Sequence, residues 1–431
     1  MLHVLKNYLL EHQLAYSMRP PAPTLGWQRF KIRLLRTSRL IARVNHRGLV
    51  VSWLWLFCTI TAITSCVYTL GAGVAARRFA NGHDKKTNIK QSVTILKPLY
   101  GDEPELFENL VSFCRQDYAG SVQIIFGVQR PDDSAIAIVR QLTSVMPDRD
   151  IVLVIDERQH GANRKVSNLI NMAARARHEI IVLADSDMRV TPDYLDIVVS
   201  TLDQPGVGLV TCLYRGQAVA GFWSQVAVLA IDTHFLPNVL VGLSLGLAHP
   251  CFGSTIALRR QTLDAIGGFA AVANHLADDY ALGEAVRRQG LAIAIPPMAI
   301  AHCCGESDLR AMIAHEMRWA RTIALVNPVG FAGSAITHTL PLSIIAFLIS
   351  GLDIMSAPIV VLALACRLIL HINIARSFSL PTPRYWLGPL RDTLSFGVFV
   401  TCFFARAVDW RGQRYVVMSD GTMRQSEKTG L

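Results

Sequence analysis

Residues 48–76 carry no charged side chain, and this uncharged stretch restricts the possible folds more than any other feature. A helix needs about 20 apolar residues to cross the hydrocarbon core of a bilayer. Hydrophobic residues make up 51% of the 431-residue chain and the mean hydropathy is +0.33, which is high for a protein that lies wholly in water. We therefore predict a transmembrane helix over residues 48–76 in a protein that is partly membrane-embedded.

The segment before this stretch, residues 1–47, is basic. Its second half alternates Arg and Lys with aliphatic residues, a pattern typical of a cationic helix on a bilayer surface. The apolar stretch comes too late and is too long for a signal peptide. Because Arg77 and Arg78 follow it directly, both flanks are basic and the positive-inside rule leaves the orientation open.

The net charge of +10 and the nine cysteines limit the partners and the compartment. The positive charges lie beside apolar segments, which favours anionic lipid over nucleic acid. The cysteines show no Cys-x-x-Cys spacing, and several fall in apolar runs where a thiol acts as a small hydrophobe. Cys303 and Cys304 follow His302, yet adjacent cysteines seldom form an ordinary zinc site. We expect reduced thiols and a site that faces the cytoplasm.

Residues 90–325 have the pattern of a water-soluble α/β domain. Short β-branched runs at 93–96, 123–128, 151–155 and 180–183 alternate with helical patterns, which predicts a mostly parallel sheet. Within this domain, residues 222–247 are apolar and carry only Asp232 and His234 as ionisable groups. That region is either an interfacial or re-entrant pair of helices, or part of the core.

Residues 326–410 are predicted to form two to four membrane helices, at about 331–351, 354–374 and 388–408. The last has Arg391, Asp392 and Arg406 at its ends. Asp353 is expected in the turn between two spans, although an intramembrane acid would be functional. The polar tail, residues 411–431, is predicted to be a small hairpin.

An acid pair follows the run at 180–183: Asp185 and Asp187. A buried parallel strand would deliver both carboxylates to the carboxyl edge of the sheet, where open α/β sheets bind ligands. Two hard oxygen ligands suit Mg2+ or Mn2+ bridging the phosphates of a nucleotide. Taken alone, the pair also fits a helix cap or a solvated turn.

Other polar groups allow two interpretations as well. Asp279 lies at the start of a helical pattern, where an acid is either a cap or a catalytic base. Arg318 is suited to grip a diphosphate and Trp319 to stack on a sugar or lipid, or the two form an interfacial anchor before a span. Lys97 and Pro98 close the first strand, and Asp132 and Asp133 follow the second.

Together these motifs resemble the ceramide glucosyltransferase family, and most closely its bacterial hopanoid-biosynthesis-associated members. The likeness covers about residues 90–325 and the order of the membrane segments. The motifs that carry it are Lys97-Pro98-Leu99-Tyr100-Gly101, Asn109-Leu110-Val111-Ser112-Phe113 with Asp117-Tyr118, Val128-Gln129 with Asp132-Asp133, Lys165-Val166-Ser167-Asn168-Leu169, Asp185-Ser186-Asp187-Met188-Arg189-Val190 with Pro192-Asp193, Ala277-Asp278-Asp279-Tyr280, and Arg318-Trp319.

The resemblance implies an α/β GT-A nucleotide-sugar-binding fold that transfers a sugar from a UDP-sugar to a lipid hydroxyl, with inversion. It implies a metal and diphosphate site at Asp185 and Asp187, a base at Asp279, and a closing pair at Arg318 and Trp319. The substrate-binding positions that it implies are Lys97, Pro98, Asp132, Asp133, Lys165, Asp185, His234 and His315. Two positions depart from the family: His315 replaces the usual Gln or Arg, and Arg130 replaces an aspartate, so that a uridine-binding acid is Asp132 or Asp133.

The chemistry of these residue types fits that assignment. An alcohol is a poor nucleophile at neutral pH, and a carboxylate that takes its proton accelerates attack by about 100- to 10,000-fold. A divalent ion, Mg2+ or Mn2+, and Arg318 would neutralise the charge growing on the departing UDP. A single displacement needs no covalent nucleophile, which agrees with the lack of a Ser or Cys catalytic constellation.

The most specific expectation is transfer of N-acetylglucosamine from UDP-GlcNAc to bacteriohopanetetrol by a multi-pass protein of the bacterial inner membrane, with its catalytic domain in the cytoplasm. The expected partners are a UDP-sugar, a lipid acceptor and the membrane, and no nucleic acid. Alternatives are a ceramide glucosyltransferase, a transferase with a polyprenyl phosphate acceptor, a processive polysaccharide synthase, and a non-catalytic UDP-sugar-binding scaffold. The oligomeric state stays open.

Overall fold

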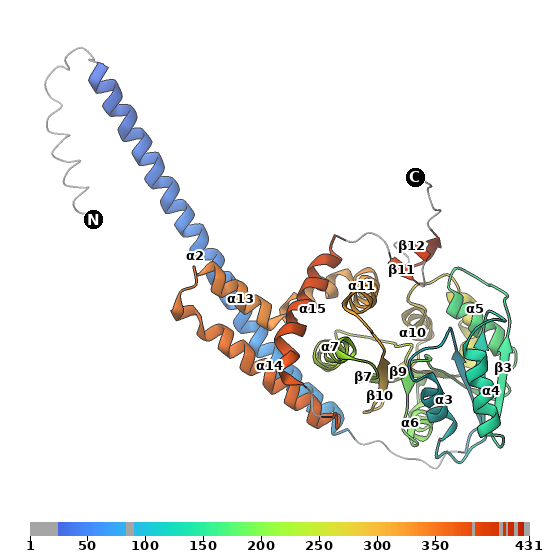
Figure 1. The fold of residues 1–431 in the computed structure, drawn as a ribbon. Helices are drawn as coiled ribbons and strands as arrows, with labels where there is room; N and C mark the ends of the chain where they lie inside the picture. Colours follow the sequence, from blue (N-terminus) through green and yellow to red (C-terminus); the bar gives the residue numbers. More distant parts are fainter. Residues whose placement is uncertain are drawn as a thin grey trace.

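A long helix and an α/β domain dominate the computed structural model, which describes residues 25–82, 90–381, 384–404, 408–410, 413–417 and 421–425. The first half of the predicted basic segment, residues 1–24, lies outside the described residues. Helix α2 (Leu25–Ala80) is 56 residues long and projects from the rest of the molecule (Figure 1). The basic residues 25–47 and the apolar residues after them therefore belong to one helix of about 84 Å, since an α-helix rises 1.5 Å per residue.

The central sheet has seven strands in the order β3-β2-β1-β4-β8-β6-β9. Strands β1 to β4 run parallel, β8 runs antiparallel to both of its neighbours, and β6 and β9 are parallel to each other. This arrangement confirms the predicted α/β class with a mostly parallel sheet. The strands are β1 (Val93–Pro98), β2 (Val122–Val128), β3 (Asp150–Ile155), β4 (Ile180–Leu183), β6 (Val207–Thr211), β8 (Ile256–Arg259) and β9 (Ala292–Ala294).

Helices cover both faces of this sheet because its central strands are apolar on both sides. One core lies between the sheet and helices α3, α4 and α6, and a second lies between the opposite face and α5, α9, η3 and α10. These helices are α3 (Leu106–Cys114), α4 (Ala135–Val145), α5 (Arg164–Ala173), α6 (Tyr194–Leu202), α9 (Arg260–Ala265), η3 (Phe269–Val272) and α10 (Asp278–Arg288).

The register of the sheet brings the expected site residues to one edge. Leu96 of β1 pairs with Leu183 of β4, and Pro98 pairs with Gly127 of β2. A second sheet, in the order β5-β10-β7, adjoins this edge. Its strands are β5 (Met188–Arg189), β7 (Leu213–Ala218) and β10 (Ala299–Cys304).

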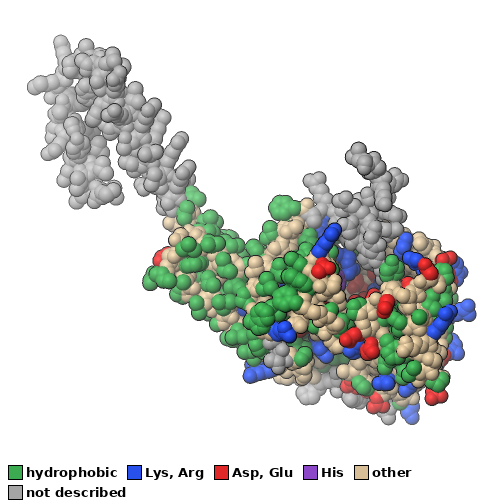
Figure 2. All heavy atoms as spheres, viewed as in Figure 1, with side chains coloured by type: hydrophobic (Ala, Val, Ile, Leu, Met, Phe, Trp, Pro, Cys, Tyr) green, Lys and Arg blue, Asp and Glu red, His purple; other side chains and the backbone are tan. Residues whose placement is uncertain are grey.

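Three described helices are long and apolar enough to cross a membrane: Val50–Ala80, Phe222–Ser244 and Ile354–Ser377. A fourth span is possible if the bent pair Pro328–Thr337 and Thr339–Ile349, which turns by 67°, counts as one. Helices α13 (Thr339–Ile349) and α14 (Pro358–Ser377) lie along α2 (Figure 1). Apolar side chains gather on this bundle, whereas charged side chains gather on the α/β domain (Figure 2). The bundle is therefore the part of the molecule that suits a bilayer.

The predicted segment at 388–408 differs from the other two. Helix α15 (Gly388–Cys402) has 15 residues, and it is not among the described helices that are long and apolar enough to span. Arg391 and Asp392 are almost fully buried in it, against the helix α11 (Leu309–Val326) and the segment after residue 222. One face of this helix packs against the protein because Arg391 and Asp392 find partners there.

The apolar segment 222–247 forms helix α7 (Phe222–Ala230), a π-helical turn η2 (Ile231–Phe235) and helix α8 (Leu236–Ser244). This segment packs against two parts of the protein. Leu236 and Leu240 pack with Ala72 and Ala76 of α2. Val226 and Leu229 belong to a cluster with residues of the α/β domain. The segment joins the membrane bundle to the α/β domain.

The remaining elements connect or follow these. The short ones are α12 (Pro328–Gly333), η4 (Ser334–Thr337), η5 (Ile354–Ser356) and η6 (Tyr385–Leu387). In the tail, β11 (Val408–Trp410), β12 (Gln413–Val417) and β13 (Met423–Gln425) form an antiparallel sheet. Strand β13 is anchored to the α/β domain, since the amide of Met423 donates to the carbonyl of Asn274 over 2.7 Å.

Candidate active site

The centre of the candidate site is Asp185, two residues beyond the end of β4. The ammonium of Lys165, on α5, lies 2.6 Å from Asp185 Oδ1 and 3.7 Å from Asp278 Oδ2. Burial opposes the charge on Lys165, but Asp185, Asp278 and Asp279 together raise its pKa above the ordinary value. Burial raises the pKa of Asp185 in turn, against the effect of Lys165. The lysine therefore balances three acids that would otherwise repel one another.

Lys97 contacts the backbone of the loop that carries Asp185. Its side chain is fully buried, and its Nζ donates to the backbone carbonyl of Asp185 over 2.7 Å and lies 3.7 Å above the ring of Phe113. Burial lowers the pKa of Lys97 to about 7. Pro98, the last residue of β1, is also buried. Lys97 therefore fixes the position of the loop that carries Asp185.

The backbone of Gly253 lies between Asp279 and Asp185. Asp279 Oδ2 accepts a hydrogen bond from the Gly253 amide over 2.9 Å, and Oδ1 accepts one from the Tyr280 amide over 2.8 Å. A β-carbon at Gly253 would lie 2.9 Å from both Asp185 Oδ2 and Lys165 Nζ. Burial, followed by the neighbouring Asp278, raises the pKa of Asp279 to about 6. The two carboxylates thus lie next to each other, and we call the space around Asp185, Asp187, Lys165 and Asp279 the recess.

Asp187 faces His302 of β10 at the same edge. His302 Nε2 is 3.4 Å from Asp187 Oδ2, while Asp187 Oδ1 and His302 Nδ1 are buried without a hydrogen-bond partner among the described residues. Asp185 and Asp187 keep 32% and 35% of their side-chain surfaces exposed, so the recess is open. Burial lowers the pKa of His302, which favours the neutral imidazole that binds metals.

The described residues hold no ready-made cluster of three or more His, Cys, Asp or Glu ligands. The Asp187 and His302 pair nevertheless fits a divalent ion of the Mg2+ or Mn2+ type, because such ions take one or two protein ligands and complete their shell with substrate phosphates and water. The unsatisfied Asp187 oxygen is the observation that supports this fit.

Aromatic rings form one side of the recess. Trp319 lies 4.4 Å from the His315 ring and 5.5 Å from the His302 ring, and the Tyr214 ring on β7 is 5.7 Å from His302. His315 Nδ1 is 2.8 Å from Glu306 Oε1, so this histidine, in the position expected for Gln or Arg, is held by an acid. Arg318, on the same helix α11, is half-buried.

The two acids after β2 occupy different settings. Asp133 Oδ1 accepts hydrogen bonds from the amides of Gly101 and Ala135, both over 3.0 Å. It thereby joins the loop after β1, where Gly101 has a φ of +73°, to the start of α4. Asp132 is exposed and pairs with Arg130. Asp133 organises the loop, and Asp132 is the acid that faces solvent.

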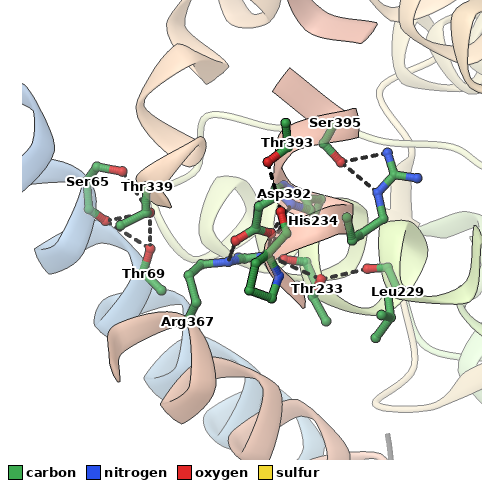
Figure 3. A network of polar contacts seen from close by, with 12 residues as sticks. Ser65, Thr69, Leu229, Thr233, His234, Thr339, Arg367, Asp392, Thr393 and Ser395 are labelled. Carbon is green, nitrogen blue, oxygen red and sulfur yellow. Dashed lines mark hydrogen bonds and ion pairs between the residues drawn. The ribbon is translucent and has the colours of Figure 1, made fainter. Parts of the chain in front are cut away.

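His234 belongs to another buried network, whose members are Asp392 and Arg367. Its Nε2 lies 2.9 Å from Asp392 Oδ1 and 3.0 Å from the guanidinium of Arg367. Figure 3 shows these three side chains pointing toward one another between η2, α14 and α15. The structure therefore brings together Lys97, Lys165, Asp185, Asp187 and Asp279, with His315 and Trp319 at the rim, but sets His234 in the helical part.

Three further residues lie at these acids, Gly253, His302 and Tyr214, and no motif in the sequence assigns them to this site. His302 was considered only as part of a zinc site with its neighbouring cysteines. Its position on β10, antiparallel to β5 directly after the acid pair, pairs it with Met188. A histidine on an apolar strand is an ordinary core residue, so only this strand pairing identifies it.

Comparison with known proteins gives a family match over most of the chain. The family model described as glycosyl transferase family 21 matches residues 56–423. Ceramide glucosyltransferase 1 of Caenorhabditis elegans is 27% identical over 204 residues, which are 47% of this chain and 43% of that protein. An N-acetylglucosaminyltransferase of Rhizobium leguminosarum bv. viciae is 22% identical over 273 residues, 61% of this chain and 63% of that protein. The chain thus spans about half the length of the curated relatives it matches.

Among solved structures, a mannosyltransferase from Pyrobaculum calidifontis in complex with GDP-Man and Mn2+ is 20% identical. The match covers 80% of this chain and 99% of that chain, with a TM-score of 0.45.

Proposed function

Because the chain belongs to glycosyl transferase family 21, as its motifs predicted, we propose that it transfers a sugar from a UDP-sugar to a lipid hydroxyl with inversion at the anomeric carbon. The observation that carries this proposal is the hydrogen bond from the Gly253 amide to Asp279, next to Asp185, whose Oδ2 would lie 2.9 Å from a β-carbon at Gly253. It sets a carboxylate with a raised pKa next to the strand end where open α/β sheets bind nucleotides.

Asp279 is the proposed general base. Backbone amides hold each of its oxygens, so the carboxylate has a fixed orientation and keeps lone pairs to accept the proton of an incoming hydroxyl. With a pKa of about 6, it is ionised at neutral pH and still a stronger base than an ordinary aspartate. The alcohol oxygen then forms the new glycosidic bond as the bond to UDP breaks.

The donor side is proposed to be Asp185, Lys165, Asp187 and His302. A divalent ion held by Asp187 and His302 would supply positive charge for the diphosphate. Lys165 keeps Asp185 in place, and Lys97 fixes the loop that carries both acids. Arg318, one residue before Trp319, is the proposed cation for the departing UDP. The exposed Asp132 is the better candidate for uridine contact, since Asp133 is occupied by two amides.

The membrane bundle supports a lipid as the acceptor. The apolar helices α2 and α14 pack on α8, and α7 and η2 of the same segment pack on Tyr214 and Trp319 of the recess. We propose that the chain lies in the bacterial inner membrane with this recess on the cytoplasmic side, where UDP-sugars are available.

The more specific proposal is N-acetylglucosamine transfer from UDP-GlcNAc to bacteriohopanetetrol. The resemblance of the motifs supports it, and so does the match to a protein named N-acetylglucosaminyltransferase. The second candidate is glucose transfer from UDP-glucose to ceramide, which the match to ceramide glucosyltransferase 1 favours.

The test is a product assay on membranes that contain the protein. UDP-glucose and UDP-GlcNAc are each offered with a hopanoid polyol or with ceramide, and the lipids are read by mass spectrometry. A hexosamine-bearing hopanoid would support the specific proposal, and glucosylceramide would support the second candidate. Membranes with Asp279→Asn serve as the control. No glycolipid from any pairing, from protein that still binds UDP, would refute transfer to these acceptors.

A further inference from the structure

Helix α15 carries two adjacent residues of opposite charge, Arg391 and Asp392, which are 1% and 2% exposed. Charged side chains are almost never buried so fully unless each is paired. Neither residue touches the acids of the recess, and the proposed chemistry does not use them. Both, however, bind elements that carry aromatic rings of the recess.

Arg391 binds the helix that carries Trp319. Its two terminal nitrogens each lie 2.6 Å from an oxygen of Glu316 on α11, and Nε donates to Ser395 over 3.0 Å. This is the two-pronged Arg–carboxylate geometry, which fixes orientation as well as distance. Trp319 lies three residues after Glu316, so it occupies a neighbouring position on the helix.

Asp392 binds the π-helical turn. Its oxygens accept from Arg367 over 2.6 and 2.8 Å, and Arg367 donates to the carbonyl of Thr233 over 2.9 Å. His234 lies 2.9 Å from the same carboxylate (Figure 3). The residue after His234 is Phe235, whose ring stacks on Tyr214 with centroids 4.5 Å apart.

The two elements face each other beside the recess. The Tyr214 ring, backed by Phe235, is 6.3 Å from the Trp319 ring. Tyr214 is also close enough to Asp279, Asp187 and Asp185 for these acids, after burial, to raise its pKa. Leu387 just before α15 and Leu394 within it pack into the same apolar cluster as Trp319, Tyr214 and Phe235. Helix α15 thus contacts both the helix that carries Trp319 and the turn that carries Phe235.

We propose that Arg391 and Asp392 are positioning residues: together they hold the Trp319 ring and the Tyr214–Phe235 pair in contact with each other beside the acids, where the lipid acceptor meets Asp279. This inference rests on the proposed function. Neither residue touches substrate. They act through Glu316 and through the Arg367–Thr233 contact, so their loss should impair use of the acceptor. The donor residues, which are Asp185 and Asp187 after β4, Lys165 on α5 and His302 on β10, should stay in place.

The first experiment separates acceptor from donor kinetics in Arg391→Gln and Asp392→Asn. Each variant should raise KM for the lipid by about tenfold or more, because a displacement of about 1 Å near a reacting group costs up to about 100-fold. UDP affinity should stay within about twofold of the wild type, because neither residue contacts the side chains that are proposed to bind the donor. The matched control is Arg310→Gln, on the exposed side of the same helix α11.

A double variant distinguishes positioning from plain loss of stability. Arg391→Gln leaves Glu316 buried without its partner, whereas Arg391→Gln combined with Glu316→Gln removes both charges. The lipid KM of the double variant should therefore be closer to wild type than that of Arg391→Gln alone. Equal loss of UDP affinity and acceptor use in every variant would overturn the proposal, and so would unchanged lipid KM in well-folded Arg391→Gln.

The second experiment does not depend on turnover. Spin labels at Ala314 on α11 and Ser244 at the end of α8, both exposed, report the distance between the two elements by pulsed EPR. Arg391→Gln and Asp392→Asn should broaden or shift the distance distribution, and Arg310→Gln should not. If the wild-type protein forms no glycolipid, the proposed function fails, and an unchanged distance in both variants would then overturn the positioning role separately.

Discussion

The backbone amide of Gly253 donates to Asp279 Oδ2 over 2.9 Å, while its α-carbon faces the ion pair of Asp185 and Lys165. One residue without a side chain therefore connects the proposed base with the proposed donor site. The spacing of the two acids depends on this glycine, although Gly253 has an ordinary negative φ and is not required by backbone conformation.

Gly253→Ala should reduce transfer by about 100-fold or more, because its β-carbon would lie 2.9 Å from Asp185 Oδ2 and Lys165 Nζ and would displace them. The melting temperature should change little, since both groups are ends of side chains that can move. Turnover and thermal unfolding check this. Gly71→Ala, where nothing lies within 4 Å of an added β-carbon, is the control. Full activity of Gly253→Ala would show that the contact is not needed.

Asp279→Asn should abolish transfer and leave UDP binding largely intact, because an amide cannot accept the proton. In the wild type, burial raises the pKa of Asp279 to about 6. A base acts only when ionised, so kcat/KM should fall as the pH drops through about 6 and level off above it. A pH–rate profile measures this, with the exposed Asp264→Asn as the control. Substantial turnover by Asp279→Asn would remove it from the base role.

Lys165→Met should destabilise the protein by about 3 kcal/mol near pH 8, because it leaves the buried Asp278 and the partly exposed Asp185 without their cation. Without the lysine, the folded-state pKa of Asp185 lies further above its unfolded value. The folded variant then takes up more protons than the unfolded chain as the pH falls, so the defect should shrink between about pH 8 and pH 5.

Thermal unfolding at several pH values tests this prediction, and the exposed Lys90→Met is the control. A defect that stays the same size at every pH would show that Lys165 acts by packing and not by its charge.

Asp187→Ala and His302→Ala should each weaken UDP binding in the presence of Mn2+ or Mg2+, because each removes one proposed ligand of the ion. Chelation of the metal should weaken UDP binding by the wild type and have little further effect on Asp187→Ala. Calorimetric titration of UDP measures both, with the exposed His249→Ala as the control. Metal-independent UDP affinity in the wild type would contradict this role.

The sequence predicted the class of the α/β domain well because strand and helix periodicity is local. The runs at 93–96, 123–128, 151–155 and 180–183 all became neighbouring parallel strands. The acids after β4 followed from the same pattern, since a strand end carries its next residues to the sheet edge. The family resemblance is likewise confirmed by the match over residues 56–423.

Local pattern was less informative where partners are distant. Residues 388–408 were predicted to form a span, yet Arg391 and Asp392 are buried against Glu316 and Arg367. His234 was expected near the donor, but its partners are Arg367 and Asp392, more than 130 residues away. Composition cannot reveal which charges will meet.

The sequence by itself therefore determined which residue types lie where along the chain: a lysine at the end of one strand, an acid pair after another, a carboxylate at a helix start, and apolar segments that suit a bilayer. Only the tertiary structure decided that Gly253 lies between Asp279 and Asp185 and that His302 faces Asp187. It also decided that α15 contacts both the helix that carries Trp319 and the turn that carries Phe235. Periodicity and capping act over a few residues, whereas these contacts depend on how the sheets and helices pack.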